Sequence, residues 1–327
     1  WLASRTALQI GGVASIFGTT AAGAGGEFSI GQNVYFHSGG SYKRIEADEA
    51  SLYTQQNGVH NFRVTASSTA DSNITFTDVA KFDINSRISL SNNDDGTSNT
   101  IFGKSAGDSD GAGDQNVYIG ELAGGTGTQT DASDGNVGVG YNSLTDITSG
   151  QQNTSVGSYN SDDITSGSYN TAVGRSTLAS LTTGISNVAV GRATLSTAAD
   201  DESNNIAIGN SALGSAKQDG TVSSTNREVK QNIAIGEDAL VGGTLTGTNH
   251  IEGNIAIGHQ AMDATGANNQ IGTVAIGHQS LTNVSSGLRN TAIGYQTGYY
   301  NATGTDNTYV GHWAGSGTSG SHSDNVG

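Results

Sequence analysis

One short phrase recurs twelve times between Asn99 and Gly311, and each copy ends in glycine. A fixed internal repeat constrains the fold more than any other feature, because every copy must adopt the same supersecondary unit. Most neighbouring copies are 17 residues apart, while intervals of 27 and 22 residues contain insertions. The repeat glycines are Gly103, Gly120, Gly140, Gly157, Gly174, Gly191, Gly209, Gly236, Gly258, Gly277, Gly294 and Gly311.

Positions in each copy are counted from this glycine. Asn stands at minus four in eleven copies, with Thr273 as the exception, and a β-branched residue stands at minus three in all twelve. An aliphatic residue or Phe occupies minus one, and Ala occupies minus two in seven copies. The pattern predicts a short strand that ends at a glycine corner, where φ is positive or another backbone passes close. The clearest copies contain Asn187 and Gly191, Asn205 and Gly209, Asn232 and Gly236, and Asn254 and Gly258.

A unit of 17 residues cannot bury its own apolar face, but copies stacked about 4.8 Å apart form a continuous ladder. We therefore expect an all-β protein whose residues 99–327 form a parallel β-solenoid of about twelve 17-residue coils. Residues 1–98 lack the repeat and carry short alternating segments, which predict a small β-rich module.

Side-chain directions can also be predicted from the repeat. We expect the minus-three and minus-one side chains to face the coil interior, and the alanine row at minus two to permit close approach of another chain. Eleven identical polar residues at one register are hard to explain as free surface. The Asn row is therefore expected to form a ladder of stacked side-chain amides that also bond to turn backbones.

Composition excludes several functions. The chain has no Cys, and so no disulfide framework or Cys-ligated metal. A net charge of -16 with 13 basic residues disfavours nucleic acid as a partner. No apolar run approaches 18 residues, so we expect no membrane insertion. Acidic pairs such as Asp162 and Asp163 are adjacent, and neighbours in a strand point to opposite faces, so we expect no enzyme.

Two groups of residues have the composition of metal sites. Asp108, Asp110 and Asp114 alternate with small residues and glycine, as carboxylates do in calcium loops. A solvated acidic turn is the competing interpretation, and no cofactor other than calcium is expected. His259 and His278 both follow a repeat glycine on adjacent coils. They could bind a metal or titrate together, or the position could be a tolerant outward site.

Candidate receptor contacts lie in the longest insertion and near the end of the repeats. The insertion from Ser215 to Lys230 holds three of the seven basic residues of the repeat region. Aromatic residues at late turn positions could stack on sugar rings or pack at an interface between chains. The residues singled out are Lys217, Arg227, Lys230, Tyr299, Tyr300 and Trp313.

The phrase from Asn204 to Gly209 resembles the head repeats of trimeric autotransporter adhesins, and also repeats in bacteriophage tail fibres. The segment from Asn33 to Asn92 is similar to a module found upstream of such repeats in phage tail-fibre and virion structural proteins. The unit here is longer than the adhesin's, which favours the phage proteins. The resemblance implies a homotrimer, with chains intertwined or side by side, that acts as an extracellular fibre of the virion.

Such a fibre would hold a receptor-binding tip at a distance from the virion, or would itself contribute to binding of the host receptor. Its expected partners are other virion or fibre proteins and a host cell-surface glycan or protein. One alternative is the head of a bacterial trimeric adhesin at the cell surface. Another is a polysaccharide-degrading tailspike, which would require a cleft lined by aromatic residues and carboxylates.

Overall fold

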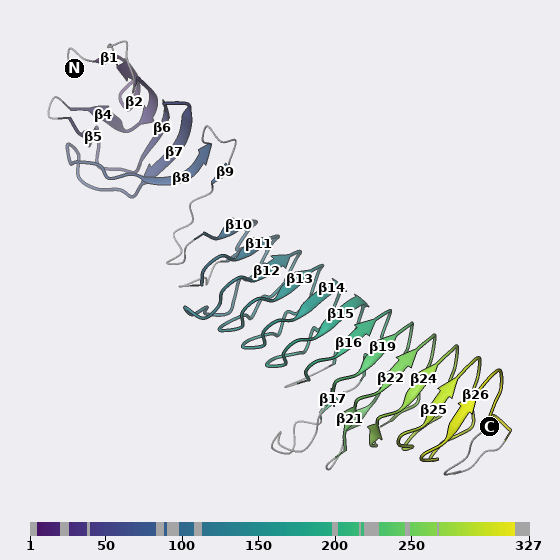
Figure 1. Cartoon of the computed structure of the whole chain (residues 1–327). Coiled ribbons are helices and arrows are strands. Elements are labelled where there is room, and N and C mark those ends of the chain that lie inside the picture. Colours follow the sequence, from purple (N-terminus) through teal and green to yellow (C-terminus); the bar gives the residue numbers. More distant parts are fainter. Residues whose placement is uncertain are drawn as a thin grey trace. The chain divides into compact units, whose positions relative to one another are not determined.

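The structure, a computed structural model, describes residues 5–19, 26–37, 40–82, 88–89, 98–107, 113–197, 202–215, 217–218, 229–245, 249–266 and 268–317. Every regular element in these ranges is a β-strand. The chain consists of two compact units, Trp1–Asn93 and Asp94–Gly327 (Figure 1). The first repeat strand begins at Thr100, shortly after this division.

The first unit is built on an antiparallel sheet with the strand order β1-β2-β3-β6-β7-β8-β9. The separate hairpin of β4 and β5 contributes to the core on one face of this sheet, where Phe17, Val34 and Leu52 are buried. The strands are β1 (Arg5–Ile10), β2 (Ala14–Thr19), β3 (Glu27–Gln32), β4 (Val34–Phe36), β5 (Tyr42–Arg44), β6 (Ala50–Gln56), β7 (Val59–Thr65), β8 (Thr77–Phe82) and β9 (Ile88–Ser89).

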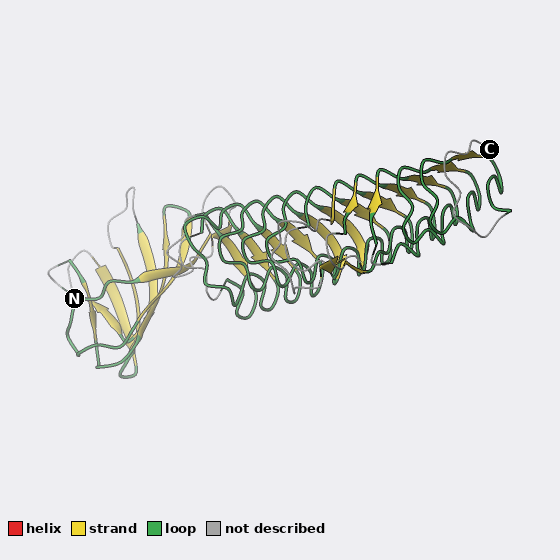
Figure 2. Ribbon diagram, turned by 90° about the horizontal axis from the view of Figure 1, so that it is seen from below, coloured by secondary structure: helices red, strands yellow, loops and turns green. Residues whose placement is uncertain are grey.

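The second unit is a β-solenoid, as the repeat predicts, with a parallel sheet of twelve strands. Equivalent repeat positions pair from coil to coil, so Val188 lies beside Ile206 and Ile206 beside Ile233. Figure 2 shows the strands side by side with loops closing each coil. They are β10 (Thr100–Phe102), β11 (Val117–Ile119), β12 (Val137–Val139), β13 (Thr154–Val156), β14 (Thr171–Arg175), β15 (Val188–Arg192), β16 (Ile206–Ile208), β19 (Ile233–Ile235), β22 (Ile255–Ile257), β24 (Val274–Ile276), β25 (Thr291–Ile293) and β26 (Thr308–Val310).

The inserted coils add two smaller parallel sheets within the second unit. One pairs β17 (Lys217–Gln218) with β20 (Thr244–Leu245). The other joins β18 (Val229–Lys230), β21 (Ile251–Glu252) and β23 (Gln270–Ile271). These short strands, which are the described strands of the longer coils outside the main sheet, pair with one another and not with the main sheet.

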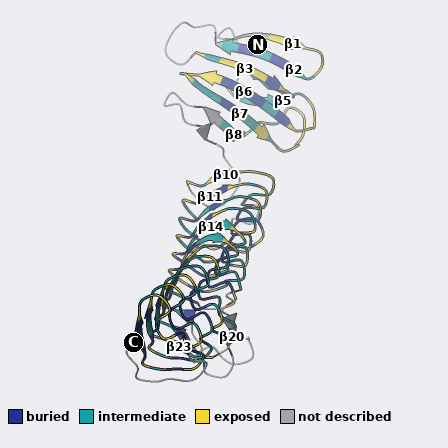
Figure 3. Cartoon of the chain, turned by 90° about the vertical axis from the view of Figure 1, so that its right-hand side faces the viewer, coloured by how far each residue is buried: buried dark blue, intermediate teal, exposed yellow. Residues whose placement is uncertain are grey.

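The predicted side-chain directions on the repeat strands are wrong. Ala172, Ala189 and Ala207 at minus two are fully buried inside the coils. Val173 at minus one and Ile206 at minus three each remain 38% exposed on the outer face of the sheet. Figure 3 shows buried, intermediate and exposed residues interleaved along the coils. The β-branched rows thus point outward and the alanine row points inward.

The reason is the narrow interior of each coil. Buried side chains at plus four and plus seven, such as Leu178 and Leu181, fill it from the opposite wall. Only a methyl group then fits at minus two. Where Tyr118 takes this position, glycine replaces the facing residue, and a Cβ atom on Gly124 would lie 2.6 Å from the Tyr118 ring.

The predicted amide ladder is present on the inner side of the coil. Nδ2 of Asn205 donates to Oδ1 of Asn187 at 3.1 Å and to the carbonyl oxygen of Val229 at 2.8 Å. The Asn205 backbone N–H donates to the same Oδ1 of Asn187 at 3.0 Å. Asn232 and Asn254 repeat the pattern, and all four amides are fully buried. Thr273 interrupts the row, because its side chain has no amide donor.

The corners use left-handed backbone far more than the glycine pattern predicts. In all twelve copies the residues at minus five, plus two and plus four have φ between 48° and 66°. Many are not glycine, and buried Leu178 and Leu195 are among them. A left-handed L-residue costs about 1–2 kcal/mol, so the burial and bonding of each coil must offset repeated local strain.

The repeat glycine satisfies both conditions expected from the sequence. Gly174 has a φ of 143°, and a Cβ atom there would lie 1.7 Å from the carbonyl oxygen of Gly191 on the next coil. Gly311, which directly follows the last of the twelve strands, has a φ of 121°, but no atom lies within 4 Å of such a Cβ. Both glycines therefore have a positive φ at a corner, but only Gly174 lies against the backbone of a following coil.

This difference predicts unequal costs for the same substitution. Gly174→Ala is expected to lower the free energy of unfolding by more than about 3 kcal/mol, because backbone must move apart across two coils. Gly311→Ala is expected to cost about 1–2 kcal/mol, which is the strain of the left-handed corner alone. Urea unfolding followed by circular dichroism measures both, and equal costs would contradict the steric explanation.

Candidate functional site

Within the described residues of the second unit, an uncovered apolar face runs along the main sheet. Its outward rows at minus one and minus three consist almost entirely of Val, Ile and Thr. Monomeric soluble proteins rarely leave contiguous apolar patches larger than a few hundred Å² uncovered. Large side chains exposed on this face are Phe102, Ile119, Val156, Val173, Val188, Ile206, Ile208, Ile293 and Val310.

In the part of the first unit that the structure describes, one face of the sheet is also apolar and uncovered. Strand pairing places Leu8 beside Ile16, Ile16 beside Ile30, Ile30 beside Tyr53, and Tyr53 beside Phe62. Leu8 is 59% exposed, and Ile30 and Phe62 are also exposed. The alternation within β1, β3 and β7 is a signal for this face. The sequence analysis used alternating segments to predict a β-rich module here, but it did not predict an exposed apolar face.

A ladder of aromatic rings follows the corner at plus one in the last coils. His259 stacks on His278 with ring centroids 5.0 Å apart, His278 on Tyr295 at 5.2 Å, and Tyr295 on His312 at 5.4 Å. Trp313 contacts His312. The ring faces therefore cover one another along the stack, which leaves mainly ring edges for an outside ligand. Nε2 of His259 lies 4.0 Å from Oε2 of Glu237.

The predicted receptor contacts belong to two parts of the repeat region, and the structure describes some of them. Tyr299 and Tyr300 pack edge to face on each other at 4.9 Å, and no described ring contact joins them to the ladder that ends at Trp313. Lys230 lies 3.6 Å from Glu252 in an ion pair of the inserted coils. Arg227 and the side chain of Lys217 fall outside the described part of the chain, so the basic insertion stays a prediction.

Of the three aspartates in the calcium hypothesis, the structure describes only Asp114. Asp108 and Asp110 lie outside the described residues, while the backbone N–H of Asp114 donates to Oδ1 of Asp134 at 2.8 Å. Across the described ranges, no three His, Asp or Glu side chains are arranged to hold a metal ion, and this includes the histidine ladder. The same ranges contain no helix that could cross a lipid bilayer.

Burial raises the pKa of three described acidic groups of the solenoid, Asp162, Asp163 and Asp263. Desolvation raises the pKa of Asp162, and the charges of Asp163 and Asp146 raise it further. Oδ1 of Asp162 is buried and accepts no hydrogen bond. Desolvation likewise raises the pKa of Asp163. Asp162 therefore carries its charge at neutral pH at a cost to the folded state.

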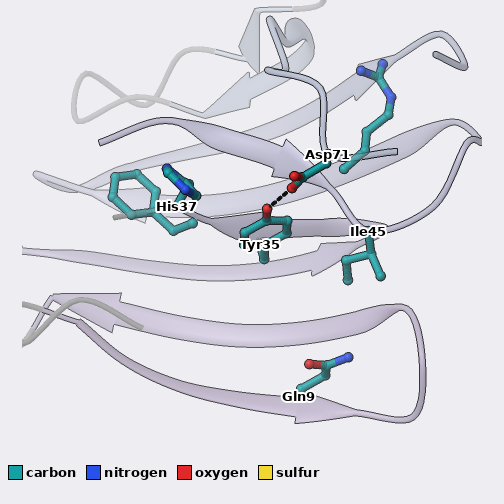
Figure 4. A pocket seen from close by; sticks show the side chains of 7 residues that line it. Gln9, Tyr35, His37, Ile45 and Asp71 are labelled. Carbon is teal, nitrogen blue, oxygen red and sulfur yellow. Dashed lines mark hydrogen bonds between the residues drawn. The ribbon is translucent and has the colours of Figure 1, made fainter. Parts of the chain in front are cut away.

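A cleft of about 450 Å³ in the first unit brings together residues far apart in the sequence (Figure 4). Its lining includes Gln9 of β1, Tyr35 of β4, and Asp71 in the segment between β7 and β8. The Tyr35 hydroxyl donates to Oδ1 of Asp71. This bond raises the pKa of Tyr35 to about 12 and lowers that of Asp71. The sequence analysis named none of these residues.

Comparison with known proteins adds no relative. No family model matches the chain, and neither the curated proteins nor the solved structures give a significant match.

The raised pKa of Asp162 predicts an unusual pH dependence. The folded state holds its proton to a higher pH than the unfolded chain, so this group's contribution to stability falls as pH rises through that interval. Asp162→Asn should therefore raise the melting temperature at pH 7, and the gain should shrink as pH approaches 4. Thermal unfolding of wild type, Asp162→Asn and the exposed control Asp131→Asn measures the effect. A gain independent of pH would contradict it.

Proposed function

We propose that this chain is a segment of a homotrimeric virion fibre in which the solenoid is the shaft. The shaft would hold a receptor-binding tip away from the virion, or would itself contribute to host receptor binding. The observation that carries the proposal is that both units leave an apolar sheet face uncovered. Burial of apolar surface is worth about 25 cal/mol per Å². Covering two such faces would therefore supply a large driving force for association.

The periodicity of the solenoid face favours another copy of this chain as the cover. Its outward rows repeat once per coil, at a strand spacing of about 4.8 Å. A partner can match such rows over many coils only if its own surface has the same period. A second copy of this chain has that period because it carries the same repeat. Three copies around one axis give a closed arrangement and agree with the resemblance to trimeric fibres.

Charge supports a role in keeping fibres apart. Between Ser105 and Gly174 the chain carries nine carboxylates and no Lys or Arg. Residues 99–327 hold 20 acidic and seven basic side chains, a net charge of -13. Neighbouring shafts would repel at low salt, so contacts with a host glycan or protein are expected at loops and ends. Other virion proteins would attach at the ends of the shaft.

The oligomeric state is the first test. Multi-angle light scattering should give three times the chain mass of 33.1 kDa. The paired variants Val173→Lys in the solenoid and Phe62→Lys in the first unit place a charge on each apolar face. Each should weaken the trimer, because a lysine ammonium would be buried against apolar neighbours. Thr128→Lys, at an exposed loop position of the solenoid, is the matched control and should leave the mass unchanged.

A stable monomer of the wild-type chain would contradict the trimer, and so would a dimer. Gold-labelled antibody against residues 99–327 then tests the location. Labelled filaments on purified phage particles from the source culture are expected. Label on the bacterial surface and not on particles would favour the adhesin hypothesis.

A further inference from the structure

The cleft between Gln9 and Asp71 has the features of a ligand site. We propose that it binds a neutral saccharide, one or two sugar rings in size, through hydroxyl hydrogen bonds and contact with aromatic rings. Its volume of about 450 Å³ lies in the range of about 300–1,000 Å³ that is typical of small-molecule sites. All lining residues belong to the first unit of one chain, so the proposal does not depend on the trimeric shaft.

A buried arginine holds the segments that build the cleft. Arg44 is 4% exposed, and its Nε donates to the carbonyl oxygen of Asp48 at 3.2 Å. Nη1 donates to the Ser72 hydroxyl at 3.2 Å, and Nη2 donates to the Thr65 hydroxyl and the Ala66 carbonyl oxygen. The guanidinium group thus ties the segment before Asp71 and the residue after it to β5. Such preorganisation lowers the entropy cost of binding.

The backbone around Asp71 is fixed as well. Asp71 has a φ of 63°, and its N–H donates to the Arg44 carbonyl oxygen at 3.0 Å. Its carboxylate accepts a hydrogen bond from the Tyr35 hydroxyl, and Figure 4 shows the two side chains directed toward each other. Asp71 therefore presents a carboxylate in one orientation, and the low pKa keeps it ionised.

The polar atoms left for a ligand are acceptors. Oδ1 of Asp71 accepts the hydrogen bond from the Tyr35 hydroxyl, while Oδ2 accepts no hydrogen bond from the described part of the chain. Nε2 of Gln9 donates to the Gly12 carbonyl oxygen at 3.1 Å, which leaves Oε1 as an acceptor. A ligand that donates at least two hydrogen bonds fits these atoms. Tyr35 and Phe36 add apolar ring surface to the same walls.

Local charge favours hydroxyl donors over an ammonium group. Nζ of Lys43 lies 4.0 Å from Oδ1 of Asp71. The carboxylate charge is thus partly offset before any ligand arrives. Sugar rings combine neutral hydroxyl donors with apolar C–H faces that pack on aromatic rings. This combination matches both kinds of surface in the cleft.

Saturation-transfer difference NMR on the full chain tests the proposal with methyl glucoside, methyl galactoside and N-acetylglucosamine as probes. At least one should receive saturation from the wild-type protein, and titration gives its Kd. Asp71→Asn, which preserves shape, should raise this Kd at least tenfold, as expected for a lost hydrogen bond to a charged group. Tyr35→Ala removes both the ring and the hydroxyl and should abolish transfer.

Asp306→Asn is the matched control, because Asp306 is an exposed carboxylate that accepts hydrogen bonds from Arg289 in the other unit. It should leave the Kd unchanged. A ¹H–¹⁵N correlation spectrum of each variant verifies that the first unit is folded. The proposal is overturned if no probe shows transfer, or if folded Asp71→Asn binds as wild type does. Binding of choline but of no sugar would also overturn it.

Discussion

The buried asparagine amides hold the register on which the rest of the shaft depends. A buried polar group without a partner costs about 1–3 kcal/mol, and each amide of the row meets its partners only when equivalent positions face each other. Oδ1 of Asn187 accepts from both the backbone and the side chain of Asn205. A slip of one residue would put the residue at minus three or at minus five in this place and leave amides on two coils unbonded. Register is therefore specified by hydrogen bonding as well as by apolar burial.

Once the ladder fixes one corner, the length of a coil can vary elsewhere. The interval from Asn205 to Asn232 is 27 residues, and the hydrogen bond from Nδ2 of Asn232 to Oδ1 of Asn205 is 3.0 Å long. The equivalent hydrogen bond between Asn187 and Asn170, which are 17 residues apart, is also 3.0 Å long. In the described part of the longer coils, short strands form two small sheets of their own, β17 with β20 and β18 with β21 and β23. Insertions are tolerated because they leave the bonded corner unchanged. The coil register thus tolerates added loops without loss of the main sheet.

Sequence alone gave the architecture because its strongest signals are rows of one residue type. The Asn and Gly rows could be interpreted directly, since few environments require the same residue in coil after coil. The direction of the β-branched rows could not, because a three-residue strand alternates identically in either orientation. Only the volume of the interior decides, and it depends on Leu178 and its equivalents across the coil. The cleft was also beyond prediction, because Gln9, Tyr35 and Asp71 meet only through the pairing of strands distant in sequence.

Charge and apolar surface are separated on the shaft, and this separation would limit how far association proceeds. In the proposed trimer the outward β-branched rows are covered and the remaining sides face water. Those sides include Asp162 and Asp163, whose charge is costly where solvent is already partly excluded. Contact between two trimers would remove more water from such carboxylates and bring like charges together. Burial of the apolar face would then drive assembly up to the closed trimer, while the acidic sides oppose any further lateral growth.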